Sequence, residues 1–184
     1  SNGEHEGTFR YEIGNPDLQP ERSYQIDAEL AYDGDIINAS ASIYNNYIHD
    51  FIYAAHHGEF IDDLPVYNYG QVNANLYGAE ASLILHPVHF IHFENTFGYT
   101  HAQNTSMDKP LSFIPAGVLR NELRYEPEIR HVQEPFVSVG IANYFKQNRV
   151  DEDFETPTAG YTLLNASVGA TFFAGKQPIK VYIS

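Results

Sequence analysis

The protein is a chain of 184 residues with a formal net charge of −14, no cysteine, 14 tyrosines and 12 phenylalanines. With only 10 Lys and Arg residues, the chain is not expected to bind nucleic acid, because phosphates are bound mainly by basic side chains. The absence of cysteine excludes disulfides and thiolate metal sites. No apolar run reaches the roughly 18 residues of a transmembrane helix, and the polar first residues do not form a signal peptide.

Alternation of apolar and polar residues predicts β-strands along the chain, with no helical period. The first strand covers residues 24–32 and the second residues 37–47, joined by the tight-turn signal Asp33-Gly34-Asp35. Further strands are expected over residues 77–86, 91–100, 119–125, 137–145 and 161–172, and from residue 179 onwards. These are about eight strands of roughly 9–12 residues, long enough to cross a bilayer when tilted.

The predicted connections alternate between short turns and long polar loops. Short turns are expected near residues 33–35, 86–87, 127–131 and 174–176, and long loops near residues 54–65, 101–115 and 146–160. If neighbouring strands pair antiparallel, all short turns lie at one end of the sheet and all long loops at the other. Outer-membrane barrels have this asymmetry.

The two faces of the predicted sheet differ in polarity. One face carries the charged residues Asp27, Glu29, Glu80, Glu94, Arg120, Glu122 and Arg124. A dry core could not hold these charges unpaired, so this face is expected to meet water. Aromatic residues gather at strand ends, where the interfacial girdles of a barrel would lie. A soluble β-sandwich that binds glycan or protein through its long loops is the alternative left open.

Four segments, in chain order, resemble signatures of the TonB-dependent receptors. Residues 11–23 resemble G-N-P-x-L-x-P-E-x-S, and residues 73–81 resemble A-x-x-x-G-x-E. Residues 111–116 resemble L-P-x-I-P-P, and residues 155–165 resemble T-P-G-Y-x-x-L-N. Taken together, the segments most resemble the zinc- and haem-uptake branch of this family.

The resemblance implies an all-β, antiparallel up-and-down meander that is part of a transmembrane barrel of about 22 strands. Residues 1–184 would then be a C-terminal portion of the barrel, without the plug domain and the final strands. The implied function is import of a metal ion, siderophore or haem across the Gram-negative outer membrane, without enzymatic activity and without a resident cofactor. The implied partners are outer-membrane lipid, the metal-containing ligand and, through the plug region, the TonB energy-transducing complex.

Histidines and carboxylates in the predicted long loops are candidate ligand-binding residues. Imidazole and carboxylate groups suit zinc, and acidic loops concentrate cations. The candidates are His5, His56, His57, Glu59, Asp62 and His101, of which His56, His57 and His101 are the candidate metal ligands. The alternative is that these histidines are ordinary polar loop residues, since adjacent side chains on an extended chain point apart.

Two further patterns have less specific readings. His86, His89 and His92 surround a predicted turn, where a structural or interfacial role is expected, with His89 directed away from the other two. A hydrolase barrel would need a serine paired with a histidine. Ser138 and Ser167 are conceivable nucleophiles, but nothing in the sequence singles out either one.

Overall fold

The computed structural model describes residues 2–5 and 7–184, which form strands and connections without a helix. The strands are β1 (Asn2–His5), β2 (Arg10–Ile13), β3 (Arg22–Asp33), β4 (Ile37–Ile61), β5 (Leu64–Val88), β6 (Ile91–Asn104), β7 (Lys109–Pro110), β8 (Val118–Tyr125), β9 (Gln133–Tyr144), β10 (Tyr161–Ala174) and β11 (Gln177–Ile183). Within these described residues, no helix is long and apolar enough to span a membrane.

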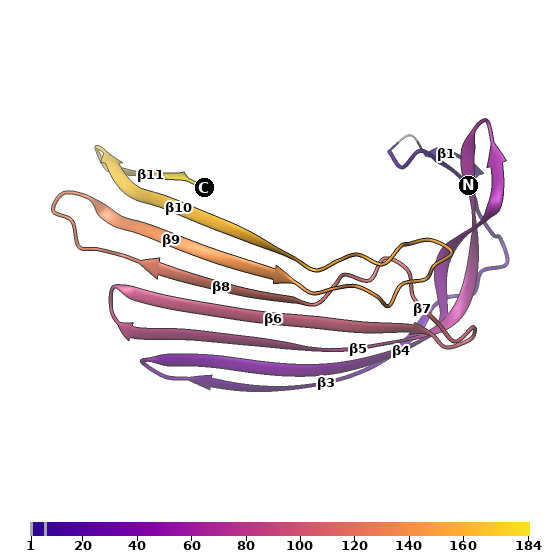
Figure 1. Ribbon diagram of the computed structural model, residues 1–184, viewed down its shortest axis with the longest axis horizontal. Helices are drawn as coiled ribbons and strands as arrows, with labels where there is room; N and C mark the ends of the chain where they lie inside the picture. Colours follow the sequence, from indigo (N-terminus) through magenta and orange to yellow (C-terminus); the bar gives the residue numbers. More distant parts are fainter. Residues whose placement is uncertain (1, 6) are drawn as a thin grey trace.

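Eight long strands form one antiparallel meander in a single curved layer, in the order β3-β4-β5-β6-β8-β9-β10-β11 (Figure 1). The predicted all-β meander is therefore confirmed. The described residues form one sheet with no second sheet packed against it, so the β-sandwich alternative is wrong. The sequence did not predict the small β1–β2 hairpin, which joins the sheet through a parallel pairing of β2 with β5.

The strand register aligns apolar side chains in rows across one face, the apolar face. One such row crosses six strands and consists of Ile37, Leu85, Phe93, Leu123, Val139 and Ala166. Leu123 is 52% exposed and Val139 is 54% exposed. Apolar surface gains roughly 25 cal/mol per Å² when it is removed from water, so an exposed row of this extent fits a lipid environment.

The opposite face, the polar face, carries hydrophilic rows. Ser40, Ser82, Thr96 and Arg120 face one another across neighbouring strands. In the neighbouring row of the same face, Glu94 lies directly opposite Glu122. Like charges at directly opposite positions repel unless water screens them, so the polar face needs hydration, as predicted.

Connections differ in length between the two ends of the sheet, as predicted. Turns at residues 34–36, 89–90, 126–132 and 175–176 define the short-turn end, and connections at residues 105–117 and 145–160 define the long-loop end. The turn between β5 and β6 lies at His89 and Phe90 and not at His86-Pro87, because β5 continues to Val88.

The predicted polar loop at residues 54–65 is wrong. This segment continues β4 and β5 as a β-hairpin, here called the outer hairpin (residues 50–72). The outer hairpin bends away from residues 37–49 of β4 and residues 73–88 of β5 (Figure 1). The bend lies at a bulge containing Asp50, whose φ is 58°. Asp62 and Asp63 form the tip with φ values of 51° and 64°, the left-handed geometry of a tight hairpin turn, which Asp tolerates better than most residues.

Candidate functional site

The N-terminal hairpin is attached to the outer hairpin by a small polar cluster. Glu12 on β2 accepts hydrogen bonds from the Tyr69 hydroxyl at 2.8 Å and from Arg10 Nε at 2.7 Å. The Tyr69 hydrogen bond is the main cause that lowers the pKa of Glu12, with Arg10 adding to it against the opposing effect of burial. The same hydrogen bond, together with burial, raises the pKa of Tyr69. The guanidinium of Arg10 also lies 4.9 Å from the centre of the Tyr67 ring.

A cavity of about 270 Å³ lies beside this cluster, at the base of the outer hairpin. Its aromatic lining comes from Phe51 and Tyr53 on β4, Tyr67 on β5 and Phe113 in the connection at residues 105–117. The other lining residues are Arg10, Ile52, Ala54, Leu76, Asn104, Pro110, Leu111, Ser112, Ile114 and Asp151. This aromatic cavity therefore combines residues of β2, β4, β5, β6 and the two long connections.

One wall of the aromatic cavity rests on an apolar cluster at the long-loop end of the polar face. Ala74 and Ala102 are fully buried, and Leu111 folds over them. Ile48, Phe51, Leu76 and Ile114 pack around this cluster. The connection that carries Leu111 is turned by Asn104, whose Oδ1 accepts hydrogen bonds from the backbone N–H groups of Ser106 and Met107. The cavity wall thus has a packed base.

The two long connections are tied to each other. Gln147 Nε2 donates to the backbone oxygen of Ile114 at 2.8 Å, and the backbone N–H of Phe113 donates to the Glu155 carboxylate. Lys109 forms an ion pair with Asp153 at 2.6 Å, and the Asp153 hydrogen bond is the main cause that raises the pKa of Lys109. These links hold the connection at residues 145–160 against the cavity wall.

The candidate residues at the outer hairpin occupy different environments. His56 Nδ1 lies 2.9 Å from the backbone oxygen of Val66, and its ring stacks on Tyr67. Glu59 and Asp62 are exposed at the hairpin tip. His5 is exposed at the end of β1 and faces Arg10 across the β1–β2 pairing.

His101 lies on β6, away from the outer hairpin. Its ring stacks on Tyr77 with 4.4 Å between ring centres, and its Nδ1 is buried without a hydrogen-bond partner among the described residues. His56 pairs with Tyr67 and His101 with Tyr77, so their positions along β5 differ by ten residues, about 30 Å of extended chain. The structure does not bring these two histidines together.

The metal-ligand assignment stays a prediction, because the side chain of His57 lies outside the described part of the structure. Within the described part, no group of three or more His, Cys, Asp or Glu side chains is arranged to hold a metal ion. Sequence reasoning missed the aromatic cavity. Phe51 and Tyr53 follow the alternation of an ordinary strand, and no sequence signal brings them beside Phe113, about sixty positions later.

A second polar cluster lies at the short-turn end. His86 and His92 face each other with 2.7 Å between their Nδ1 atoms, and His92 Nε2 lies 3.3 Å from Glu126 without hydrogen-bond alignment. An Arg124 hydrogen bond is the main cause that lowers the pKa of Glu126. His89 lies apart from this pair, 3.6 Å from Glu128.

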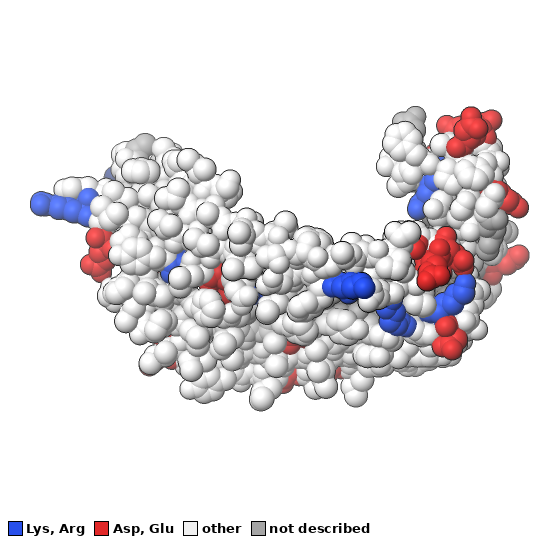
Figure 2. All heavy atoms as spheres, viewed as in Figure 1, with Lys and Arg blue, Asp and Glu red and all other residues white. Residues whose placement is uncertain are grey.

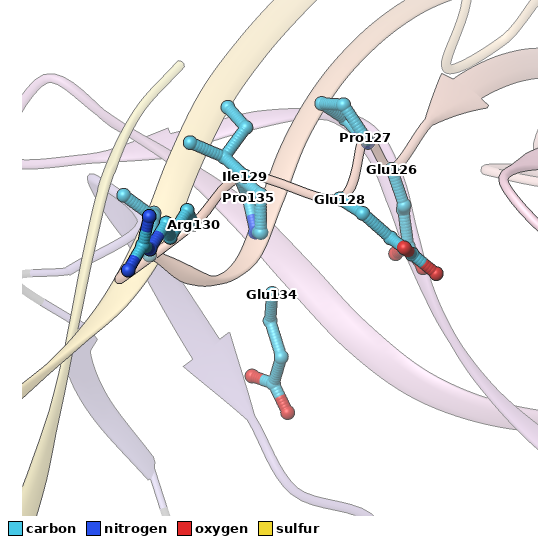
Figure 3. A pocket seen from close by; sticks show the side chains of 8 residues that line it. Glu126, Pro127, Glu128, Ile129, Arg130, Glu134 and Pro135 are labelled. Carbon is cyan, nitrogen blue, oxygen red and sulfur yellow. The ribbon is translucent and has the colours of Figure 1, made fainter.

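The connection at residues 126–132 borders an open hollow of about 580 Å³. Glu126 and Glu128 lie together on one side of it, and Arg130 points to the other side (Figure 3). The hollow has no aromatic lining and draws all its lining from residues 126–135. It is therefore a weaker candidate for a ligand site than the aromatic cavity.

Solved structures of metal transporters and receptors share the fold of this chain. The copper transporter OprC matches with a TM-score of 0.76 and 22% identity over 91% of this chain and 25% of that chain. The ferric enterobactin receptor PfeA of Pseudomonas aeruginosa matches with a TM-score of 0.65 and 20% identity over 91% of this chain and 26% of that chain. The siderophore receptor PirA of Acinetobacter baumannii matches with a TM-score of 0.62 and 19% identity over 94% of this chain and 28% of that chain.

The chain thus spans about a quarter of the length of these receptors. At these identities the matches show the fold, and a family model gives the membership. The model described as "TonB dependent receptor-like, beta-barrel" matches residues 1–178. The chain therefore belongs to the TonB-dependent receptor β-barrel family, whose members are transport receptors of the Gram-negative outer membrane and not enzymes.

Proposed function

We propose that this chain is a C-terminal portion of the barrel of an outer-membrane receptor that imports a small metal complex. The candidates for this cargo are siderophores, haem and complexes of zinc or copper. One observation carries the proposal: the polar face of the sheet leads at its long-loop end to the aromatic cavity. Outer-membrane barrels place long loops outside the cell, so the cavity would face incoming ligands. The copper, siderophore and ferric enterobactin receptors with the same fold support a metal complex as cargo.

The proposed partners follow from the surfaces and from the family. The exposed apolar rows would contact outer-membrane lipid, and the polar face would line the interior of the barrel. Energy would come from the TonB complex through a plug region that is not in this chain. The chain itself would supply the barrel wall and part of the external ligand site.

Uptake by a receptor deletion strain tests the proposal. Radiolabelled iron, copper and zinc would be offered as free salts and as organic chelates to wild-type, receptor-deleted and tonB-deleted cells. We expect uptake of at least one metal complex to be lost in both deletion strains and restored by the full-length receptor gene. Unchanged uptake of every metal and chelate after receptor deletion would overturn the proposal.

A further inference from the structure

The aromatic cavity presents flat side chains from separate segments to one small volume. Phe51, Tyr53, Tyr67 and Phe113 line it together. The faces of such rings bind flat organic groups, and they attract cations through their negative quadrupole. A bare metal ion would need converging donor atoms instead, and no group of three or more His, Cys, Asp or Glu side chains supplies them in the described part of the chain. The cavity therefore favours an organic ligand over a bare ion.

Two charged side chains line the cavity, and they differ in their pairing. Arg10 forms an ion pair with Glu12 at 2.6 Å, which neutralises its guanidinium. The carboxylate of Asp151, which is half-buried, takes part in no ion pair among the described residues and receives one hydrogen bond, from the backbone N–H of Asp153. Its charge acts on the nearby Lys109, but the Lys109 ammonium is paired with Asp153. The net charge presented to a ligand in the cavity is therefore negative.

The surroundings of the cavity have the same sign of charge. The segments at the long-loop end (residues 2–22, 50–72, 105–117 and 145–160) carry thirteen carboxylate side chains and five Lys or Arg side chains among the described residues. Figure 2 shows acidic side chains gathered over this end of the molecule. Such a field raises the local concentration of cations and repels anions before they reach the site.

Phe113 is held in an unusual conformation at the mouth of the cavity. Its φ is 61° and its side chain is 67% exposed, although bulky residues rarely adopt positive φ. The Glu155 carboxylate receives its backbone N–H, and the neighbouring Ile114 oxygen is bound by Gln147. Backbone strain of this kind persists where the surroundings enforce it, often at ligand contacts. The arrangement holds an aromatic ring open to a ligand.

From these observations we infer that the aromatic cavity binds an organic metal chelate of neutral or positive charge and discriminates against negatively charged chelates. The Phe113 ring packs on the organic part of the chelate and attracts a cationic group such as an ammonium, and Asp151 forms an ion pair with that group. The inference rests on the proposed function and names the class of cargo.

Binding to the purified full-length receptor in detergent tests this inference. The probes are the positively charged iron(III) complex of the linear trihydroxamate desferrioxamine B and the negatively charged iron(III) complex of enterobactin, measured by quenching of intrinsic fluorescence. We expect the positive complex to bind at least tenfold more tightly at low salt, and the preference to shrink as salt screens the acidic field. Equal or tighter binding of the negative complex would overturn the inference.

Substitutions then place the site. Asp151→Asn and Phe113→Ala should each weaken binding of the positive complex about tenfold, the loss expected for one charge-assisted or aromatic contact. Glu152→Gln and Phe60→Ala are the matched controls, since both residues are exposed and lie outside the cavity lining, and each should change affinity less than twofold. Wild-type affinity in both cavity variants would place binding elsewhere and contradict the inference.

The two proposals can fail separately. If receptor-dependent uptake is found but only for negatively charged chelates, import stands and the charge preference is wrong. If deletion of the receptor changes the uptake of no metal complex, the proposed function itself is wrong.

Discussion

Gln71 binds the backbone of Gln19 in both directions, although 52 positions separate the two residues. The backbone N–H of Gln19 donates to Gln71 Oε1 at 2.8 Å, and Gln71 Nε2 donates to the backbone oxygen of Gln19 at 2.6 Å. Gln71 Nε2 also donates to the backbone oxygen of Asp50, at the bend of the outer hairpin. One side chain thus fixes both the bend and the N-terminal segment that precedes β3.

Replacement of Gln71 by Ala should loosen this junction. Each lost hydrogen bond costs about 1 kcal/mol, so amide hydrogen exchange in the outer hairpin should accelerate about tenfold or more. Hydrogen exchange of the full-length receptor, followed by mass spectrometry, measures this change. Gln177→Ala, at an exposed position beside the β10–β11 turn, is the control and should leave the outer hairpin unchanged. An unchanged exchange rate in Gln71→Ala would show that packing alone sets the bend.

The Glu12–Tyr69 hydrogen bond should make attachment of the N-terminal hairpin depend on pH at both extremes. The pKa of Glu12 is lowered from 4.5, so its contribution is complete above pH 4.5 and is lost as the pH falls through the lower folded-state value. The pKa of Tyr69 is raised from 10.0, so its contribution is complete below pH 10 and is lost as the pH rises through the higher folded-state value. Protease cleavage within residues 2–13 should therefore be slow and constant between pH 4.5 and pH 10.

Tyr69→Phe provides the check on this mechanism. Without the hydroxyl, the largest cause of the low Glu12 pKa is removed. The rise in cleavage at acidic pH should therefore begin at a higher pH than in the wild type. The rise in cleavage at alkaline pH should disappear, because no Tyr69 phenol remains to ionise. If cleavage of the Tyr69→Phe receptor depends on pH as in the wild type at both extremes, this hydrogen bond is not the titrating contact.

Gly78 should not tolerate a side chain, because the Tyr44 ring crosses over it. The Tyr44 hydroxyl spans β5 to reach Thr100 Oγ1 at 2.7 Å. A Cβ atom on Gly78 would overlap the backbone oxygen of Tyr99 and would lie 2.6 Å from the Tyr44 hydroxyl oxygen. Gly78→Ala should therefore destabilise the barrel by about 1–3 kcal/mol in urea unfolding of the refolded receptor. Gly98→Ala is the matched control on the neighbouring strand, since a Cβ there has no neighbour within 4 Å.

The long strands could be predicted from the sequence because alternation and turn signals act locally. The faces of β3, β6 and β10 follow directly from the period of two. The sequence of the outer hairpin predicts a loop, because His, Gly and Asp are common in loops and the tight Asp62–Asp63 turn does not have the usual Asn-Gly or Asp-Gly signature. The parallel β2–β5 pairing leaves no local trace in the sequence.

The candidate site was harder to predict than the fold. Histidine and carboxylate residues predict a metal site from composition, whereas the aromatic cavity depends on how strands β2, β4, β5 and β6 meet the two long connections. Phe51 and Phe113 come together only because the connection at residues 105–117 folds back over Ala74 and Ala102. No period or motif carries that information.

A transmembrane barrel requires the apolar face of the sheet to meet lipid and the polar face to meet water. Single cysteines would be introduced into a cysteine-free full-length receptor in liposomes. They would replace Phe93, Leu123 or Val139 on the apolar face, or Glu94 or Glu122 on the polar face. A fluorophore on each cysteine would be challenged with a quencher dissolved in the lipid and with a quencher dissolved in water. We expect lipid quenching at residues 93, 123 and 139 and water quenching at residues 94 and 122. Water quenching at all five positions, or lipid quenching at residues 94 and 122, would contradict the assignment of this sheet to a transmembrane barrel.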